Sequence, residues 1–249
     1  MRSKLIVGNW KMNGSHDLIE NFYQSFSLPF DEVDLEVVIC PPNVFITTMQ
    51  NLFEGSGILI GAQNVHSENN GAFTGETSVS LLRECGVNWC IVGHSERREH
   101  FGDTDEIISR KMEILIRHKI RPILCVGETL EQRESLSFEE VVVKQLRVGL
   151  SKINNKDLHK CVIAYEPVWA IGTGITAEPK QAEYMHKIIR KELLSISSRE
   201  NAKKIKILYG GSVNPDNVGS LINIKEIDGA LIGGASLIPS SFQKIIEYY

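Results

Sequence analysis

The sequence predicts an α/β fold and, within that class, a closed barrel of eight strand–helix units, (β/α)8. Short apolar runs rich in Val and Ile recur along the chain, and their hydrophobicity is continuous rather than alternating. Continuous runs are typical of parallel strands that are covered on both faces. A chain of 249 residues also has the usual length of one such barrel. The expected strands are residues 5–7, 37–40, 58–60, 89–92, 123–126, 161–164, 205–208 and 230–232.

Segments with helical spacing separate these strands. One apolar stripe runs through residues 107–116, with Asp103 or Thr104 placed to cap its first turn. Proline is favoured at the first helical position. Pro179 is therefore expected to open one helix, and Pro215 and Pro239 the seventh and eighth. The three stripes are Ile107, Ile108, Lys111, Met112, Leu115 and Ile116; Val143, Leu146, Leu150 and Ile153; and Met185, Ile188, Ile189 and Leu193.

A doubly wound open sheet is the rival architecture, because it also alternates strands and helices. The even spacing of the eight units favours closure of the sheet, and no low-complexity linker divides the chain. We therefore expect a single (β/α)8 barrel domain over residues 1–249.

The composition limits the classes of partner. Hydrophobic residues make up 42% of the chain and charged residues 23%, with a formal net charge of −4. This mix is that of a globular protein and argues against a nucleic-acid partner. No apolar stretch approaches the roughly 18 residues of a membrane span, so no membrane partner is expected. Five cysteines without a Cys-x-x-Cys pair fit buried residues of a reducing compartment, and we expect a cytoplasmic protein.

Polar residues that directly follow the apolar runs are the candidates for chemistry. In a (β/α)8 barrel the carboxyl ends of the strands meet at one mouth, where catalytic groups gather. Asn9 and Lys11 follow the first run, and on one strand they would point to the same face. His94 follows the fourth run. Each has a plain alternative: Asn9 as a turn residue, Lys11 as a surface charge and His94 as a structural histidine. Facing a cavity, Lys11 could instead bind an anion or stabilise a developing oxyanion.

Glu166 follows the sixth run and is the candidate base. A carboxylate at a strand end often serves only to cap a helix or to pair with a cation. Here the neighbours Tyr165, Val168 and Trp169 are apolar or aromatic. We expect these neighbours to exclude water from the carboxylate and make it a stronger base, which favours a catalytic role for Glu166.

Two glycine pairs follow the seventh and eighth runs. Gly210 and Gly211 precede Ser212, and Gly233 precedes Gly234. Either pair alone could serve only to turn a strand into a helix. At these two positions, however, barrels commonly bind phosphate with backbone N–H groups and a helix N-terminus. Together the two pairs therefore favour a phosphate site.

The segment from Pro167 to Ala177 is too long for a tight barrel loop and suits a lid. Its glycines match the spacing of a dinucleotide fingerprint, but residues 167–171 intervene between the strand and the first glycine. No nucleotide cofactor is therefore expected. The seven histidines show no metal-ligand spacing, so no metal is expected either.

Six motifs, in order and across nearly the whole chain, resemble the triosephosphate isomerase family. The motif at 209–213 carries little weight alone, whereas six in the right order are highly specific. They are residues 8–13 (GNWKMN), 71–76 (GAFTGE), 92–98 (VGHSERR), 164–174 (AYEPVWAIGTG), 209–213 (YGGSV) and 233–237 (GGASL).

The resemblance implies the single (β/α)8 TIM barrel and an isomerase of glycolysis and gluconeogenesis that needs no cofactor. Its reaction interconverts dihydroxyacetone phosphate and D-glyceraldehyde 3-phosphate through an enediolate. By resemblance, Glu166 is the base and His94 the electrophile, and Lys11 and Asn9 are catalytic and substrate-binding. The implied phosphate contacts are Gly172, Ser212, Gly233 and Gly234.

The resemblance also implies a homodimer. The loop from Gly71 to Glu76 would contact the second copy, with Thr74 reaching toward the partner's site. One residue departs from the family pattern: Ile175 stands at the lid's second hinge, where the family often has Lys. Two alternatives stay open. One is another phosphate-binding barrel enzyme, such as a pentose-phosphate epimerase, and the other is a non-catalytic sugar-phosphate binder that kept the fold.

Overall fold

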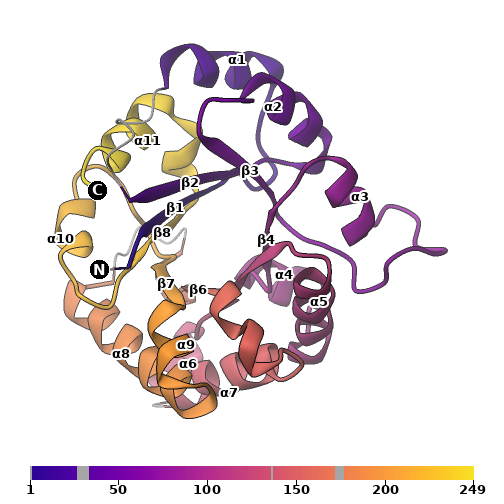
Figure 1. Cartoon of the computed structure of the whole chain (residues 1–249). Coiled ribbons are helices and arrows are strands. Elements are labelled where there is room, and N and C mark those ends of the chain that lie inside the picture. Colours follow the sequence, from indigo (N-terminus) through magenta and orange to yellow (C-terminus); the bar gives the residue numbers. More distant parts are fainter. Residues whose placement is uncertain (1, 27–33, 136, 172–176) are drawn as a thin grey trace.

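The computed structural model describes residues 2–26, 34–135, 137–171 and 177–249. Eight parallel strands of this part of the chain close into a barrel in the order β1 to β8 (Figure 1). Strand β8 pairs back onto β1, with Leu5 opposite Gly229, so the open-sheet alternative is excluded. The strands are β1 (Lys4–Asn9), β2 (Leu35–Cys40), β3 (Ile58–Ala62), β4 (Trp89–Val92), β5 (Arg121–Val126), β6 (Val162–Tyr165), β7 (Lys206–Tyr209) and β8 (Gly229–Ile232).

Helices surround the barrel on its outside (Figure 1). The α-helices are α1 (His16–Ser25), α2 (Ile46–Leu52), α3 (Val79–Glu84), α4 (Ser95–His100), α5 (Asp105–Arg117), α6 (Leu130–Glu134), α7 (Phe138–Leu150), α8 (Pro179–Ile196), α9 (Arg199–Lys204), α10 (Val218–Ile222) and α11 (Pro239–Ile246). Four short 3₁₀ helices accompany them in the described chain: η1 (Asn43–Phe45), η2 (Asn155–Lys160), η3 (Val168–Ala170) and η4 (Gly234–Leu237).

The strands are apolar throughout because both of their faces are buried. Alternate residues, such as Leu5 and Val7 of β1, form a separate cluster that contains no helix residue and so fills the barrel interior. The residues between them, such as Ile6, join the larger cluster under the helices. Two covered faces explain the continuous runs in the sequence.

The helix starts follow the predicted signals in three cases out of four. The Thr104 side chain accepts a hydrogen bond from the Ile107 N–H and caps α5. Pro179 and Pro239 are the first residues of α8 and α11. The prediction for Pro215 was wrong, because α10 begins only at Val218.

Two asparagines explain the late start of α10. The Asn214 side chain accepts hydrogen bonds from the N–H groups of Asp216 and Asn217, and the Asn217 side chain accepts one from the Asn214 N–H at 2.9 Å. These local bonds hold the chain in a turn around Pro215 and compete with helix formation.

The second predicted stripe was also partly wrong. Helix α7 ends at Leu150, and Val142 is buried in it while Val143 is only partly buried. Ile153 is buried from the turn that follows the helix, where its N–H donates to the Leu150 carbonyl.

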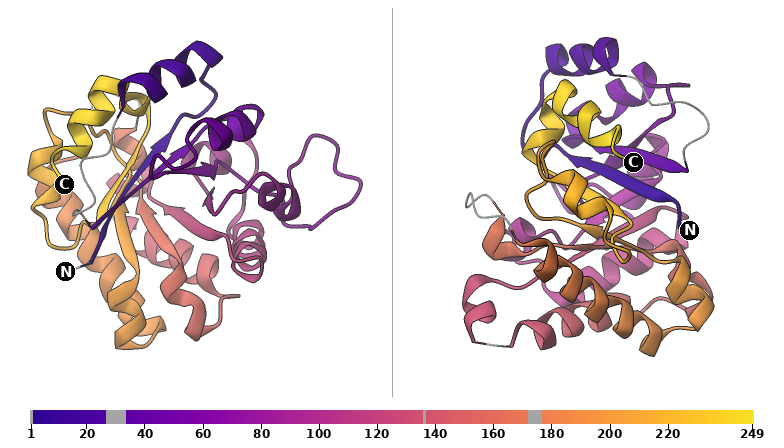
Figure 2. Two further views of the ribbon diagram at one scale, coloured as in Figure 1. Left: turned by 45° about the horizontal axis from the view of Figure 1, so that its top comes forward. Right: turned by 90° about the vertical axis from the view of Figure 1, so that its left-hand side faces the viewer.

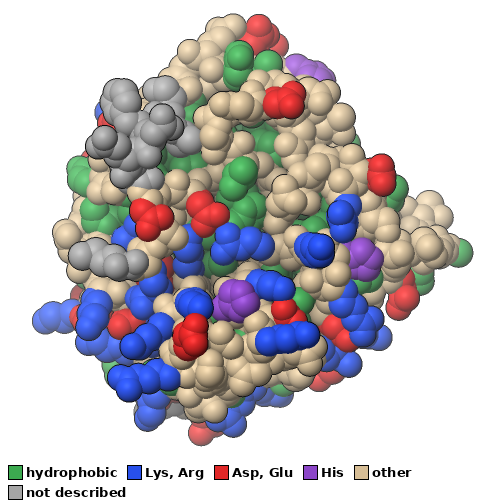
Figure 3. Space-filling view, in the orientation of Figure 1, with side chains coloured by type: hydrophobic (Ala, Val, Ile, Leu, Met, Phe, Trp, Pro, Cys, Tyr) green, Lys and Arg blue, Asp and Glu red, His purple; other side chains and the backbone are tan. Residues whose placement is uncertain are grey.

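Charged side chains close the amino ends of the strands. Lys206 Nζ lies 2.6 Å from a Glu36 oxygen, and Arg121 binds the same carboxylate at 3.0 Å. Figure 3 shows Lys and Arg side chains interspersed with Asp and Glu on the face that Figure 1 presents. No helix in the described ranges combines the length and apolarity that crossing a bilayer requires.

The segment between β3 and α3 projects from the body of the molecule, as Figure 1 and the left view of Figure 2 show in the purple part of the chain. It contains the loop from Gly71 to Glu76, and the Phe73 side chain in it is exposed. The other described loops stay closer to the barrel.

Candidate active site

A cavity of about 340 Å³ lies at the carboxyl ends of β1, β4, β6, β7 and β8. Of the predicted site residues, Gly172 lies outside the described residues, as does Ile175. All the others line this one cavity: Asn9, Lys11, His94, Glu166, Ser212, Gly233 and Gly234. A carboxylate, an imidazole, an ammonium group and two glycine loops therefore face a common space.

Glu166 follows β6 directly and is 2% exposed. Its Oε2 accepts a hydrogen bond from the Ser95 N–H at 2.9 Å, and its Oε1 lies 3.0 Å from Nε2 of His94. The Glu166 N–H donates to the Val126 carbonyl at 2.8 Å, so β5 holds its backbone in place. A buried carboxylate on a rigid strand end is suited to accept a proton away from water.

His94 presents an N–H group to this carboxylate. The residue precedes α4, and its Nδ1 accepts the Glu96 N–H at 3.3 Å. Because Nδ1 is an acceptor, we assign the proton of the neutral ring to Nε2, which faces Glu166. The Glu96 carboxylate is 3.6 Å from Nδ1, too far for a hydrogen bond that would reverse this assignment.

Lys11 owes its place to an unusual backbone conformation. Strand β1 ends at Asn9, and Lys11 has a φ of 52°, in the left-handed region that side-chain-bearing residues rarely adopt. The idea that strand alternation aligns Asn9 with Lys11 was therefore wrong. Instead the Asn9 side chain accepts the Lys11 N–H at 3.2 Å, and Gln63 donates to the Lys11 carbonyl at 2.8 Å. Such strain is typically held at functional sites.

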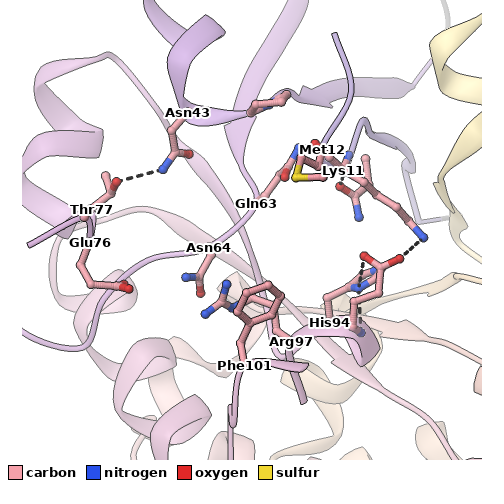
Figure 4. Close-up of a pocket in the computed structure, with 14 residues that line it drawn as sticks. Lys11, Met12, Asn43, Gln63, Asn64, Glu76, Thr77, His94, Arg97 and Phe101 are labelled. Carbon is pink, nitrogen blue, oxygen red and sulfur yellow. Dashed lines mark hydrogen bonds and ion pairs between the residues drawn. The ribbon is translucent and has the colours of Figure 1, made fainter. Parts of the chain in front are cut away.

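A second cavity of about 360 Å³ adjoins the first and shares Asn9, Lys11 and His94 with it. Figure 4 shows this cavity, with Lys11 and His94 on the same side of it. Lys11 Nζ lies 2.6 Å from Oε1 of Glu96. Glu76 and Thr77 line the opposite side of this cavity (Figure 4). The Lys11 ammonium group thus lines both cavities, and among the described residues its ion pair is with the half-exposed carboxylate of Glu96.

Three glycines at the cavity leave room that a larger residue would fill, beside Glu166 at Gly210 and in the open space at Gly233 and Gly234. A Cβ atom on Gly210 would lie 2.9 Å from Cγ of Glu166, so only glycine fits beside this side chain. A Cβ on Gly234 would meet nothing within 4 Å, and one on Gly233 would point toward Lys11 at 3.5 Å. These last two glycines leave open space where η4 begins, which suits an anion bound by backbone N–H groups.

Glu128 is a functional candidate to which the sequence analysis gave no role. It is 0% exposed. Its Oε1 accepts hydrogen bonds from Trp169 at 2.8 Å, Tyr165 at 3.0 Å and Arg133 at 3.2 Å. Burial raises the pKa of this carboxyl. Tyr165 and Trp169, the aromatic neighbours expected around Glu166, thus bind Glu128 instead. Tyr165 ends β6, where successive side chains point to opposite sides of the strand, and Trp169 lies in η3.

Within the described ranges, no group of three or more His, Cys, Asp or Glu side chains is arranged to hold a metal ion. Five free cysteines are present, of which only Cys85 is partly exposed.

The sequence model of one protein family, described as triosephosphate isomerase, matches residues 4–249. The chain belongs to the triosephosphate isomerase family. Curated members of this family align over the whole chain. A protein named triosephosphate isomerase from Endomicrobium trichonymphae is 45% identical over 249 residues, covering 100% of this chain and 99% of that protein. One of the same name from Thermoanaerobacter pseudethanolicus is 43% identical over 248 residues, covering 100% of both. A third, from Roseiflexus castenholzii, is 45% identical over 252 residues, covering 100% of this chain and 98% of that protein.

Proposed function

We propose that the chain is an isomerase that interconverts dihydroxyacetone phosphate and D-glyceraldehyde 3-phosphate, a reaction of glycolysis and gluconeogenesis. The observation that carries this proposal is the single cavity lined by Glu166, His94, Lys11 and the glycine loops. A three-carbon sugar phosphate has acidic C–H bonds next to its carbonyl, two oxygens that carry the charge of the enediolate, and one phosphate. The cavity has a base for the first, donors for the second and glycine loops for the third.

Glu166 is the proposed base. Its carboxylate takes a proton from the hydroxymethyl carbon next to the substrate carbonyl, and the electrons of that C–H bond form the carbon–carbon double bond of an enediolate. One proton then moves between the two enediolate oxygens. Finally the Glu166 carboxylic acid returns a proton to the former carbonyl carbon, which leaves an aldehyde. No electron is gained or lost overall, so the chemistry requires no redox cofactor.

His94 and Lys11 are proposed to stabilise the negative charge on oxygen. The Nε2–H of a neutral imidazole donates to the enediolate oxygen, and the Lys11 ammonium adds a positive charge at the same side of the cavity. Asn9 holds Lys11 in its strained conformation and contributes a polar group to the cavity. In a water-poor site, each donor that points at a developing charge typically lowers the activation free energy by about 3 kcal/mol.

Substrate binding has to rearrange the base. In this structure the Glu166 carboxylate is held by the Ser95 N–H and by His94. When a substrate oxygen takes the His94 N–H, one of these two bonds is lost and the carboxylate can turn toward the substrate carbon. The same donor thus binds the substrate and releases the base.

The phosphate is proposed to bind at Ser212, Gly233 and Gly234, with Gly172 of the lid as a further contact. Ser212 also donates to the Ala170 carbonyl at 3.2 Å, which joins the phosphate loop to the start of the lid. Binding energy from the phosphate can in this way promote closure over the reacting carbons.

A valine at Gly233 is expected to weaken phosphate binding at least tenfold, by about 1.4 kcal/mol or more. Its Cβ would sit 3.5 Å from Lys11, an ordinary contact, so the fold should persist while the branched side chain fills the anion site. Inhibition of the isomerase by inorganic phosphate measures the loss. The melting temperature of Gly233→Val, compared with that of the parent, is the control for folding. Unchanged inhibition in Gly233→Val would remove Gly233 from the phosphate site.

We further propose that residues 1–249 form one domain and that the chain is a cytoplasmic homodimer. The projecting loop from Gly71 to Glu76, with Thr74 near its tip, is the proposed dimer contact. The cavity beside Lys11 and the 96% exposed side chain of Met12 are the proposed surface that receives it. Sedimentation at micromolar concentration should give the mass of two chains. A one-chain mass would contradict the dimer but not the reaction.

The experiment that tests the proposed reaction compares substrate classes. With triose phosphates we expect rapid interconversion in the presence of EDTA, and with pentose 5-phosphates we expect none. Conversion of the pentose phosphates alone would favour another phosphate-binding barrel enzyme. Phosphate-ester binding without any conversion would favour a non-catalytic binder. No feature of the described residues favours either alternative.

A further inference from the structure

A buried histidine lies behind the two strand ends that carry the proposed base and the phosphate loop. His186 of α8 is 0% exposed and does not line the substrate cavity. Its ring meets Tyr165 edge-on, with 5.9 Å between ring centroids and 90° between planes. It also packs against Tyr209 at 6.4 Å with the planes tilted by 35°. One side chain thus touches the last residues of β6 and β7.

The two tyrosines lie one residue from the proposed chemistry. Tyr165 and Tyr209 are paired across β6 and β7, and they directly precede Glu166 and Gly210. The Gly210 N–H donates to the Tyr165 carbonyl at 2.7 Å. A shift of the Tyr165 ring would therefore move the backbone of Glu166, and a shift of the Tyr209 ring would move the start of the phosphate loop at Gly210.

The orientation of the His186 ring is set from the other side. Its Nδ1 lies 3.0 Å from the Glu226 carbonyl, and since a carbonyl only accepts, Nδ1 carries the proton. Burial lowers the pKa of His186 to about 4, so the ring is neutral near pH 7. Its Nε2 is buried and has no hydrogen-bond partner among the described residues. A buried polar atom without a partner costs stability, so packing alone does not account for a histidine here.

We propose that His186 is a positioning residue of the isomerase. Its ring, oriented by the Glu226 carbonyl, holds Tyr165 and Tyr209 side by side and thereby sets the distance between the Glu166 carboxylate and the phosphate loop. This inference rests on the proposed function, because it concerns the geometry of that reaction. Loss of the His186 ring should therefore lower kcat but leave the affinity for inorganic phosphate unchanged, because inorganic phosphate contacts the phosphate loop without reaching Glu166.

Two substitutions separate the ring from the hydrogen bond. His186→Asn keeps an amide donor toward the Glu226 carbonyl but removes the ring, and its kcat should fall about tenfold, because a small misplacement of a base is costly. His186→Phe removes the donor but keeps a flat ring against both tyrosines, and its kcat should stay within about threefold of the parent. In both variants inhibition by inorganic phosphate should stay within about threefold.

Leu193→Ala, a cavity-forming change at a buried position of the same helix, is the matched control. Its kcat, corrected for the folded fraction, should equal that of the parent. If the Asn variant does not fold by circular dichroism, His186→Leu replaces it with the same expected loss. Equal kcat in the Asn and Leu193→Ala variants, or a larger loss in Phe than in Asn, would overturn the proposal. An inactive parent chain would instead refute the proposed function.

Discussion

Glu166→Asp should lower kcat about 100-fold or more. The substitution keeps a carboxylate of similar basicity but withdraws it by one methylene from the substrate carbon. Hydrogen bonds hold the strand end in place, because the Glu166 N–H donates to the Val126 carbonyl and the Gly210 N–H donates to the Tyr165 carbonyl. Proton transfer then has to cross a longer distance, and its rate falls steeply. Progress curves with each triose phosphate at saturation measure the effect.

Phosphate affinity is the internal control for this variant. Inhibition by inorganic phosphate should change by less than about threefold, because the loops at Ser212 and Gly233 are intact. The melting temperature should also stay close to that of the parent. Turnover at the parental rate would show that some other group removes the proton and would remove Glu166 from the role of base.

His94→Asn should lower kcat about 100- to 1000-fold, the usual cost of losing one donor to a developing oxyanion. Asparagine is a good helix N-cap, so its side chain can replace Nδ1 as acceptor for the Glu96 N–H and preserve α4. Its amide is too short to reach the position of Nε2 next to Glu166. The variant thus removes the donor to the substrate while leaving the cap in place.

His94→Ala is the comparison that separates these two losses. Both variants should lose turnover, but only the alanine variant should also lose the cap, which is worth about 1 kcal/mol of unfolding free energy. Chemical denaturation measures this difference. If the asparagine variant keeps more than a tenth of the parental kcat, His94 is not the main stabiliser of the oxyanion.

The sequence predicts the barrel well because its signal is long and repetitive. Each strand must be apolar on two faces, and β4 coincides with the expected residues 89–92. Helix starts follow local rules where nothing competes, as at Thr104 and Pro179. At Pro215 the side chains of Asn214 and Asn217 compete for the backbone, and the rule gives the wrong start.

The site is predicted less completely, because its geometry depends on contacts between distant segments. Lys11 is held in its left-handed conformation by hydrogen bonds with Asn9 and with Gln63, which directly follows β3. No local sequence pattern predicts the bond with Gln63. Glu128 follows the fifth apolar run, so its place at the mouth can be read from the sequence, but its three donors come from elsewhere. His186 carries no local signal at all, since only the packing of α8 on β6 and β7 brings it to the two tyrosines.

Transfer of a proton by a single carboxylate is tested most directly by isomerisation in deuterium oxide. Dihydroxyacetone phosphate is incubated with the protein and EDTA, and the product is followed by proton NMR. We expect conversion to glyceraldehyde 3-phosphate with deuterium on the carbon next to the aldehyde in part of the product, because the protonated Glu166 exchanges with solvent before it returns its proton. Conversion without any deuterium would indicate a direct hydride shift, and no conversion would show that the chain is not this isomerase; either result would contradict the account.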